Sequence, residues 1–130
     1  MNISDYIAEL EALINSSKIV SSYNLTIDRK TADIAFVSGK IDFRDGTILD
    51  FKEFIEESEG SIEKYKYGYN YRKGSDSIFR YDNAPDPSAK GIKTFPYHKH
   101  LQDKTIAESS HVKLSDVLSE IEELFIPDSG

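Results

Sequence analysis

Five residues in the second half of the chain have types and spacing suited to chemistry: Arg80, Asp82, His98, Lys99 and His100. In an extended segment His98 and His100 point the same way and Lys99 points the opposite way. Two histidines so placed can serve as general base and general acid, because an imidazole titrates near neutral pH. Arg80 can bind a phosphate through two parallel hydrogen bonds. The alternative is a surface ion pair of Arg80 with Asp82 and two polar loop histidines, with no catalytic role.

Four tyrosines alternate with polar or small residues in the clearest strand pattern of the chain: Tyr65, Tyr67, Tyr69 and Tyr71. A tight turn at Gly74-Ser75 would pair this strand with the next one. That pairing predicts that the tyrosines share a sheet face with Arg80 and Asp82. On such a face the rings could stack bases, so the candidate substrate-binding residues are Tyr65, Tyr67, Tyr69 and Asn83. The alternative is ordinary aromatic packing within a sheet, and a one-residue slip would invert the faces.

Glu53 stands among Leu49, Phe51 and Ile55 on one predicted strand face, where an inward carboxylate needs a partner. It is a candidate additional carboxylate, acting as a general base or a metal ligand. The alternative is a charge that protects an edge strand. The chain has no cysteine, which excludes a thiol nucleophile and a cysteine-ligated zinc. It also lacks a phosphate loop, a dinucleotide fingerprint and a nucleophile elbow, so we expect no cofactor.

The elements that must position these residues follow from the hydrophobic pattern. Ser4-Asp5 can cap a helix whose apolar stripe runs from Tyr6 to Ile14 at three- and four-residue spacing. Alternating or apolar runs then predict strands at Ile19–Ile27, Ile34–Phe43, Ile48–Ile55, Tyr65–Arg72 and Ser77–Asp82. Asp45-Gly46 is a strong hairpin signal between two of them.

The C-terminal part of the chain is less regular. Ala84–Lys93 is rich in proline, glycine and aspartate and is predicted to be a surface loop. A short strand is expected near Thr105–Glu108. Ser115 can cap a last helix with Val117, Leu118, Ile121 and Leu124 on its apolar side, and Pro127 would end it. We therefore predict one α+β domain over residues 1–130, an antiparallel five- to six-stranded meander sheet with an N-terminal and a C-terminal helix.

The charge of the chain is divided along its length. The total is −7, but residues 63–104 carry nine cations and five anions and have a net charge of +4, which leaves −11 elsewhere. Such a division could hold an anion on one side and an oppositely charged partner on the other. Chance clustering of solvated charges is the simpler alternative. No apolar run approaches the ~18 residues of a membrane span, so we expect a cytoplasmic protein without a membrane partner.

The stretch Ile78-Phe79-Arg80-Tyr81-Asp82-Asn83-Ala84-Pro85, followed by Phe95-Pro96-Tyr97-His98-Lys99-His100, resembles the TumE-like toxin family of prokaryotic toxin–antitoxin modules. The resemblance covers most of the chain, and its other motifs are generic. It implies a small cytoplasmic toxin encoded beside a helix-turn-helix antitoxin protein that neutralises it. Three positions depart from the family pattern, which often has a histidine pair at Asp86-Pro87 and a third histidine at Tyr97. These departures remove potential metal ligands and favour a metal-independent site.

Two functions from different classes remain. The first is a toxin-like ribonuclease: His98 and His100 act as base and acid, Arg80 and Lys99 stabilise charge on the phosphate, and Asp82 orients a histidine. The second is a non-enzymatic module that docks a partner protein, with the same segments as a structural network. An enzyme predicts a pocket holding Arg80 and a histidine with a shifted pKa. A metal-dependent nuclease using Glu53, Asp82 and the histidines is the third reading. The oligomeric state is left open, a homo-oligomer included.

Overall fold

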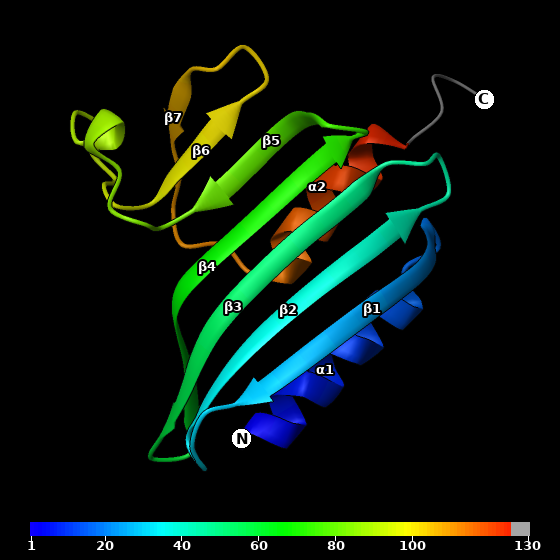
Figure 1. Cartoon of the computed structure of the whole chain (residues 1–130), viewed down its shortest axis with the longest axis vertical. Helices are drawn as coiled ribbons and strands as arrows, with labels where there is room; N and C mark the ends of the chain where they lie inside the picture. The colour runs from blue at the N-terminus through cyan, green and yellow to red at the C-terminus, as the bar shows by residue number, and fades with distance from the viewer. Residues whose placement is uncertain (126–130) are drawn as a thin grey trace.

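The structure is a computed structural model that describes residues 1–125, and its main feature is one seven-stranded antiparallel sheet with the strands in chain order (Figure 1). The strands are β1 Val20–Arg29, β2 Ile34–Phe43, β3 Ile48–Ser58, β4 Ser61–Lys73, β5 Asp76–Asp82, β6 His98–Leu101 and β7 Ile106–Glu108. The predicted α+β meander is confirmed. The strand count is higher than the predicted five to six, because the polar segment His98–Leu101 is itself a strand held between β5 and β7.

Helix α1 spans Ile3–Ser16 and begins earlier than its predicted cap. Asn2 is the N-cap: its side chain accepts a hydrogen bond from the backbone N–H of Asp5 at 2.8 Å. The Asp5 carboxylate accepts one from the N–H of Asn2 at 3.4 Å. This reciprocal arrangement satisfies two N–H groups that a helix start otherwise leaves open.

Helix α2 spans Leu114–Leu124, so it begins before Ser115, the predicted cap. The Asp116 carboxylate accepts a hydrogen bond from the backbone N–H of Lys113 at 2.9 Å and stabilises this first turn. Pro127, the predicted end of the helix, lies outside the described residues. Within residues 1–125, neither α1 nor α2 is long and apolar enough to cross a membrane.

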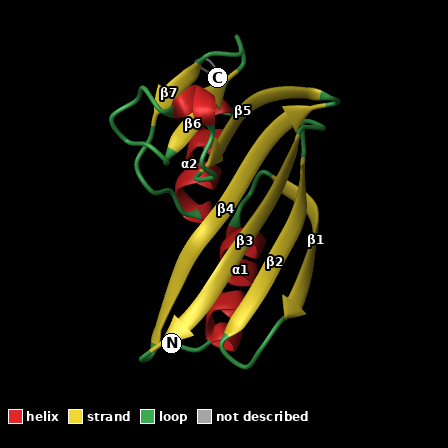
Figure 2. Cartoon of the chain, turned by 60° about the vertical axis from the view of Figure 1, so that its left-hand side comes forward, coloured by secondary structure: helices red, strands yellow, loops and turns green. Residues whose placement is uncertain are grey.

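Both helices cover the same face of the sheet and leave the other face open (Figures 1 and 2). The buried residues between helices and sheet form one cluster that includes Ile3, Leu10 and Ile14 of α1 and Val117, Leu118 and Ile121 of α2. Leu124, predicted to belong to the apolar side of α2, is exposed. We call the uncovered side the open face and the covered side the helix face.

The pairing of β4 with β5 differs from the sequence prediction. Lys73 pairs with Asp76 around the turn, as expected, but a bulge between Tyr71 and Arg72 shifts the register, so Tyr69 pairs with Tyr81. Ile78 is the extra residue. The bulge moves every later pair by one position, and side chains alternate between faces. The prediction that the tyrosines share a face with Arg80 and Asp82 is therefore wrong for Tyr67, Tyr69 and Tyr71, which are buried on the helix face.

A second bulge separates β4 into two parts. Phe54 pairs with Lys66 and Ile55 pairs with Lys64, which leaves Tyr65 as an extra residue. Lys64 is consequently buried on the helix face, whereas the Tyr65 side chain is exposed. The Tyr65 ring lies 5.1 Å from that of Phe54, measured between centroids.

Candidate functional site

The register of β5 and β6 brings four of the predicted site residues together. Asp82 pairs with His98 and Arg80 pairs with His100 across these two strands. Residues that face each other in an antiparallel pair project from the same side of the sheet. The four side chains therefore form one cluster at the β5–β6 end of the sheet, as their sequence spacing allowed. We call it the Arg–Asp–His cluster.

His98 is the buried member of the Arg–Asp–His cluster, with none of its side chain exposed. Its Nδ1 lies 2.7 Å from the carbonyl oxygen of Pro96, and its Nε2 lies 2.9 Å from Oδ1 of Asp82. A carbonyl oxygen and a carboxylate oxygen can only accept, so each contact is a hydrogen bond when the nitrogen facing it carries a proton. Nε2 of His98 also lies 3.0 Å from Nε2 of His100, and these contacts together fix the orientation of the ring.

Arg80 and His100 are the members that reach solvent, with 46% of the Arg80 side chain and 22% of the His100 side chain exposed. Nη2 of Arg80 lies 2.9 Å from Nε2 of His100, and Nε of Arg80 lies 3.2 Å from Oδ2 of Asp82. A guanidinium can only donate, so Nε2 of His100 is an unprotonated acceptor. Burial, together with the charge of Arg80, lowers the pKa of His100 from its ordinary value of 6.5.

Asp82, His98 and His100 also have the donor types of a metal site. One ligand atom from each lies within 4.8 Å of the others. Two imidazole nitrogens and a carboxylate oxygen suit zinc and other transition metals. Arg80 donates to Nε2 of His100, and Nε2 of His98 lies 2.9 Å from Oδ1 of Asp82 and 3.0 Å from Nε2 of His100. A metal bound by these three residues would have to displace the guanidinium from His100.

Lys99, the fifth residue of the predicted set, is not brought to the Arg–Asp–His cluster. It alternates with the two histidines and turns toward the helix face, where its Nζ lies 2.7 Å from a carboxylate oxygen of Glu120 on α2. The ammonium also lies 4.9 Å from the ring centroids of Phe79 and Tyr81. Lys99 thus ties α2 to the sheet rather than facing a substrate.

Glu53 is likewise on the helix face and is fully buried. Its carboxylate accepts hydrogen bonds from the hydroxyls of Tyr6, at 2.5 Å, and Tyr69, and its Oε2 lies 3.7 Å from Nζ of Lys64. Burial and the nearby carboxylate raise the pKa of both tyrosines, and burial lowers the pKa of Lys64. The buried carboxylate has found structural partners, so the prediction of Glu53 beside the histidines is wrong.

The tyrosine strand contributes to the core more than to a binding surface. Tyr67 and Tyr69 are 2% and 0% exposed, and burial raises the pKa of Tyr67 to about 12. Asn83 uses its side chain within the sheet: Oδ1 accepts from the N–H of Tyr67, and Nδ2 donates to the carbonyl of Tyr65. Of the predicted substrate-binding residues, Tyr65 alone keeps an exposed side chain.

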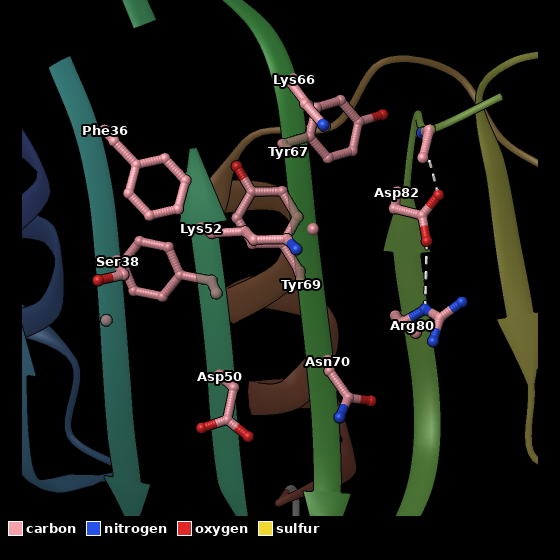
Figure 3. Close-up of a pocket in the computed structure, with 14 residues that line it drawn as sticks. Phe36, Ser38, Asp50, Lys52, Lys66, Tyr67, Tyr69, Asn70, Arg80 and Asp82 are labelled. Atoms are coloured by element: carbon pink, nitrogen blue, oxygen red, sulfur yellow. Dashed lines mark hydrogen bonds and ion pairs between the residues drawn. The ribbon is translucent and has the colours of Figure 1, made fainter. Parts of the chain in front are cut away.

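A groove of about 610 Å³ crosses the open face beside the Arg–Asp–His cluster. Figure 3 shows the side chains of Ser38, Lys52 and Arg80 along it on β2, β3 and β5, and its other lining residues include Phe36, Lys66, Gly68, Asn70 and Asp82. The groove reaches Arg80 and Asp82, while the two histidines lie behind them rather than in its lining. Sequence reasoning missed Phe36, Lys52 and Lys66, although they alternate with the core residues of β2, β3 and β4.

One of three comparisons with known proteins finds a match. A family model with the description Toxin TumE matches residues 10–125, which is most of the chain. No curated protein and no solved structure matches it. The matched segment includes the whole sheet, the Arg–Asp–His cluster and α2.

Proposed function

The chain belongs to the TumE toxin family, and from this premise we propose that it acts on RNA through the Arg–Asp–His cluster. Membership gives the chain a toxin-like role in a toxin–antitoxin module and implies an antitoxin partner. The finer statements are proposals: the target is RNA, the reaction is metal-independent phosphodiester cleavage, and the antitoxin is a helix-turn-helix protein.

The observation that carries the proposal is the contact of Arg80 with His100. A solvent-reachable guanidinium and an unprotonated imidazole nitrogen lie 2.9 Å apart at the end of a groove. Cleavage of RNA needs a cation for the phosphate and a base for the ribose 2′-hydroxyl, and this pair offers one of each. Asp82 and the buried His98 support the pair by holding its orientation.

The proposed reaction begins when a phosphate replaces His100 as the acceptor of Arg80. Nε2 of His100, which also lies 3.0 Å from Nε2 of His98, then leaves both neighbours and takes the proton of the 2′-hydroxyl, and the 2′-oxygen attacks phosphorus. The bond from phosphorus to the 5′-oxygen breaks, and that oxygen takes a proton from water in the groove. Arg80 stabilises the charge that develops on the phosphate oxygens. The products carry a 2′,3′-cyclic phosphate and a 5′-hydroxyl.

One observation favours the binding module as the second candidate. The polar atoms of the Arg–Asp–His cluster hydrogen-bond one another, and His98 also bonds the backbone of Pro96. A purely structural network would have the same contacts. The lowered pKa of His100 favours the enzyme instead, whereas the groove has only part of the predicted pocket, because Arg80 lines it and neither histidine does.

The deciding experiment is induced expression of the chain in a bacterial host, with growth followed and total RNA examined on a gel. The variants are Arg80→Ala and His100→Gln, and Lys73→Ala at the exposed β4–β5 turn is the control. We expect growth arrest and RNA fragments with the wild type and with the control, and neither effect with the two cluster variants.

The fragments should end in 2′,3′-cyclic phosphate, and purified protein should cut RNA in the presence of EDTA. Loss of cleavage with EDTA contradicts the metal-independent reaction. Growth arrest without RNA fragments contradicts the RNA target and leaves the toxin role in place. No arrest with the wild type favours the binding module.

A further inference from the structure

The open face carries an aromatic surface that the sequence did not point to. We call it the aromatic platform: Phe36 of β2, Phe54 of β3 and Tyr65 of β4. The ring centroids of Phe36 and Phe54 are 5.9 Å apart, and those of Phe54 and Tyr65 are 5.1 Å apart. Because the helices cover the other face, these rings have no covering element within residues 1–125 (Figure 2).

Two lysines accompany the aromatic platform. Lys66 pairs directly with Phe54, and Lys52 stands one position along β3 on the same face. A hollow of about 190 Å³ is lined by Phe36, Phe54 and these two lysines. Neither lysine has an ion-pair partner among residues 1–125, whereas Asp50 is paired with Arg72 and Asp82 with Arg80. Glu56, also on this face and close to Tyr65, has no ion-pair partner among residues 1–125, so the two lysines stand against one unpaired acid near the platform.

The aromatic platform and the Arg–Asp–His cluster are joined by one row of the sheet. Ser38, Lys52, Gly68, Asp82 and His98 are successive cross-strand partners on β2 to β6. Three strand spacings separate Ser38 from Asp82, which is about 14 Å. Gly68 has no side chain, and the Lys52 side chain lies over this position: a Cβ on Gly68 would be 3.4 Å from Cε of Lys52. A strand of nucleotides along this row would therefore contact the Lys52 side chain at its centre.

We propose that the open face binds single-stranded RNA, with its bases stacked on the aromatic platform and its phosphates bound by Lys52 and Lys66. This inference rests on the proposed function, since it describes how the RNA reaches Arg80 and His100. Tyr65 is exposed, and Phe36 and Phe54 are half-buried. Stacking on these rings requires unpaired bases, and lysines beside them neutralise the backbone without reading the sequence. The platform therefore selects single strands over duplexes and tolerates many sequences.

The test measures RNA binding separately from cleavage. The full chain carrying His100→Ala is titrated into a fluorescent single-stranded RNA of about 12 nucleotides and into the same RNA annealed to its complement. We expect the single strand to bind more tightly than the duplex. Phe54→Leu, which keeps an apolar side chain but removes the ring, should weaken binding of the single strand about tenfold.

The lysines are tested by salt dependence. Lys52→Ala/Lys66→Ala should reduce the slope of log affinity against log salt by about 1.4. Lys18→Ala/Lys73→Ala removes the same charge from other exposed sites and should leave the slope unchanged. Gly68→Val gives a second steric test, because its side chain fills the row without removing a charge, and it should weaken binding as well. Circular dichroism of each variant checks the fold.

Unchanged RNA binding in Phe54→Leu, or equal binding of duplex and single strand, overturns the platform. If RNA is still fragmented in cells by the wild type and not by Arg80→Ala, the proposed function survives that result. If the His100→Ala chain binds no RNA and the wild type fragments none, both proposals fail.

Discussion

His100 combines partial exposure with a lowered pKa, and this makes it the residue on which the proposed chemistry depends. Burial and the charge of Arg80 both disfavour its protonated form. A base must be unprotonated to accept a proton, so a lowered pKa keeps His100 competent across the neutral range. As pH falls through that lowered pKa, the proposed reaction should slow.

The first prediction concerns the titration of His100. Nuclear magnetic resonance should give it a pKa below 6.5 in the wild type, and Arg80→Ala should raise that value because a neighbouring cation is removed. The rise should stop short of full recovery, since burial is the larger cause. Arg72→Ala, which removes a cation paired with Asp50, is the charge-matched control and should change nothing. An unaltered His100 titration in Arg80→Ala would count against the assignment.

At the residue scale, the sequence predicts which side chains share a sheet face wherever the residues are two positions apart in a strand. Arg80 with Asp82, and His98 with His100, are each two apart in extended segments, so each pair shares a face. Lys99 was assigned to the site by chemical type alone, and the same alternation puts it on the other face. Glu53 was ambiguous because a sequence does not reveal which partners a buried carboxylate will find.

At the element scale, strand positions followed from the hydrophobic pattern, and strand register did not. The turn between β4 and β5 and the alternation along both strands were predicted correctly. The extra residue Ile78 nevertheless placed Arg80 and Asp82 on the opposite face of the sheet from Tyr69 and Tyr71. Tyr65 has the same effect between β3 and β4. A bulge has no composition signal of its own, because any residue can be the unpaired one. The aromatic platform was therefore missed, and the buried tyrosines were assigned to the binding surface in its place.

The second prediction compares two glycines on central strands. A Cβ at Gly39 would lie 2.3 Å from the Phe51 ring, whereas one at Gly68 would lie 3.4 Å from the nearest atom, at the end of Lys52. The Phe51 ring is itself stacked on Tyr69, with centroids 6.0 Å apart, and cannot easily move. Gly39→Ala should therefore lower the free energy of unfolding by about 1–3 kcal/mol.

Gly68→Ala is the matched control and should be as stable as the wild type or slightly more so, because alanine reduces the freedom of the unfolded chain. Urea unfolding followed by circular dichroism measures both variants. Equal stabilities of Gly39→Ala and Gly68→Ala would mean that the helix face near Phe51 is not packed as the structure has it.

For the whole molecule, the charge division along the sequence does not become a division of surfaces. Two lysines of the basic segment form ion pairs on the helix face, Lys64 with Glu53 and Lys99 with Glu120. The open face takes Lys52, which lies outside that segment, together with Lys66 and Arg80. Net charge along a chain predicts a field only after folding has decided which charges are neutralised.

The network around Glu53 connects most of the architecture. Tyr6 comes from α1, Glu53 from β3, and Lys64 from β4, and Nζ of Lys64 donates to the carbonyl of Val112 at 2.5 Å, just before α2. One apolar cluster surrounds this network and includes both helices. The predicted single domain spans residues 1–130, and we propose on this basis that its described part, residues 1–125, unfolds in one cooperative transition.

The third prediction tests that network. Glu53→Gln keeps the shape of the side chain and can still bond the tyrosine hydroxyls, but it leaves the Lys64 ammonium buried without a counter-charge. The free energy of unfolding should fall by about 3 kcal/mol. Adding Lys64→Met removes the stranded charge, so the double variant should recover part of the loss. Glu56→Gln, on the open face of the same strand, is the control and should change stability little.

Urea unfolding followed by both tyrosine fluorescence and circular dichroism checks this prediction together with the single-domain proposal. Coincident transitions are expected in the wild type, because the network links α1, the sheet and the start of α2. If the fluorescence and circular dichroism transitions have different midpoints, parts of the chain unfold independently and the single-domain proposal is wrong. A Glu53→Gln variant as stable as the wild type would mean that Lys64 does not need the carboxylate charge, and Glu53 would return as a candidate for a functional role.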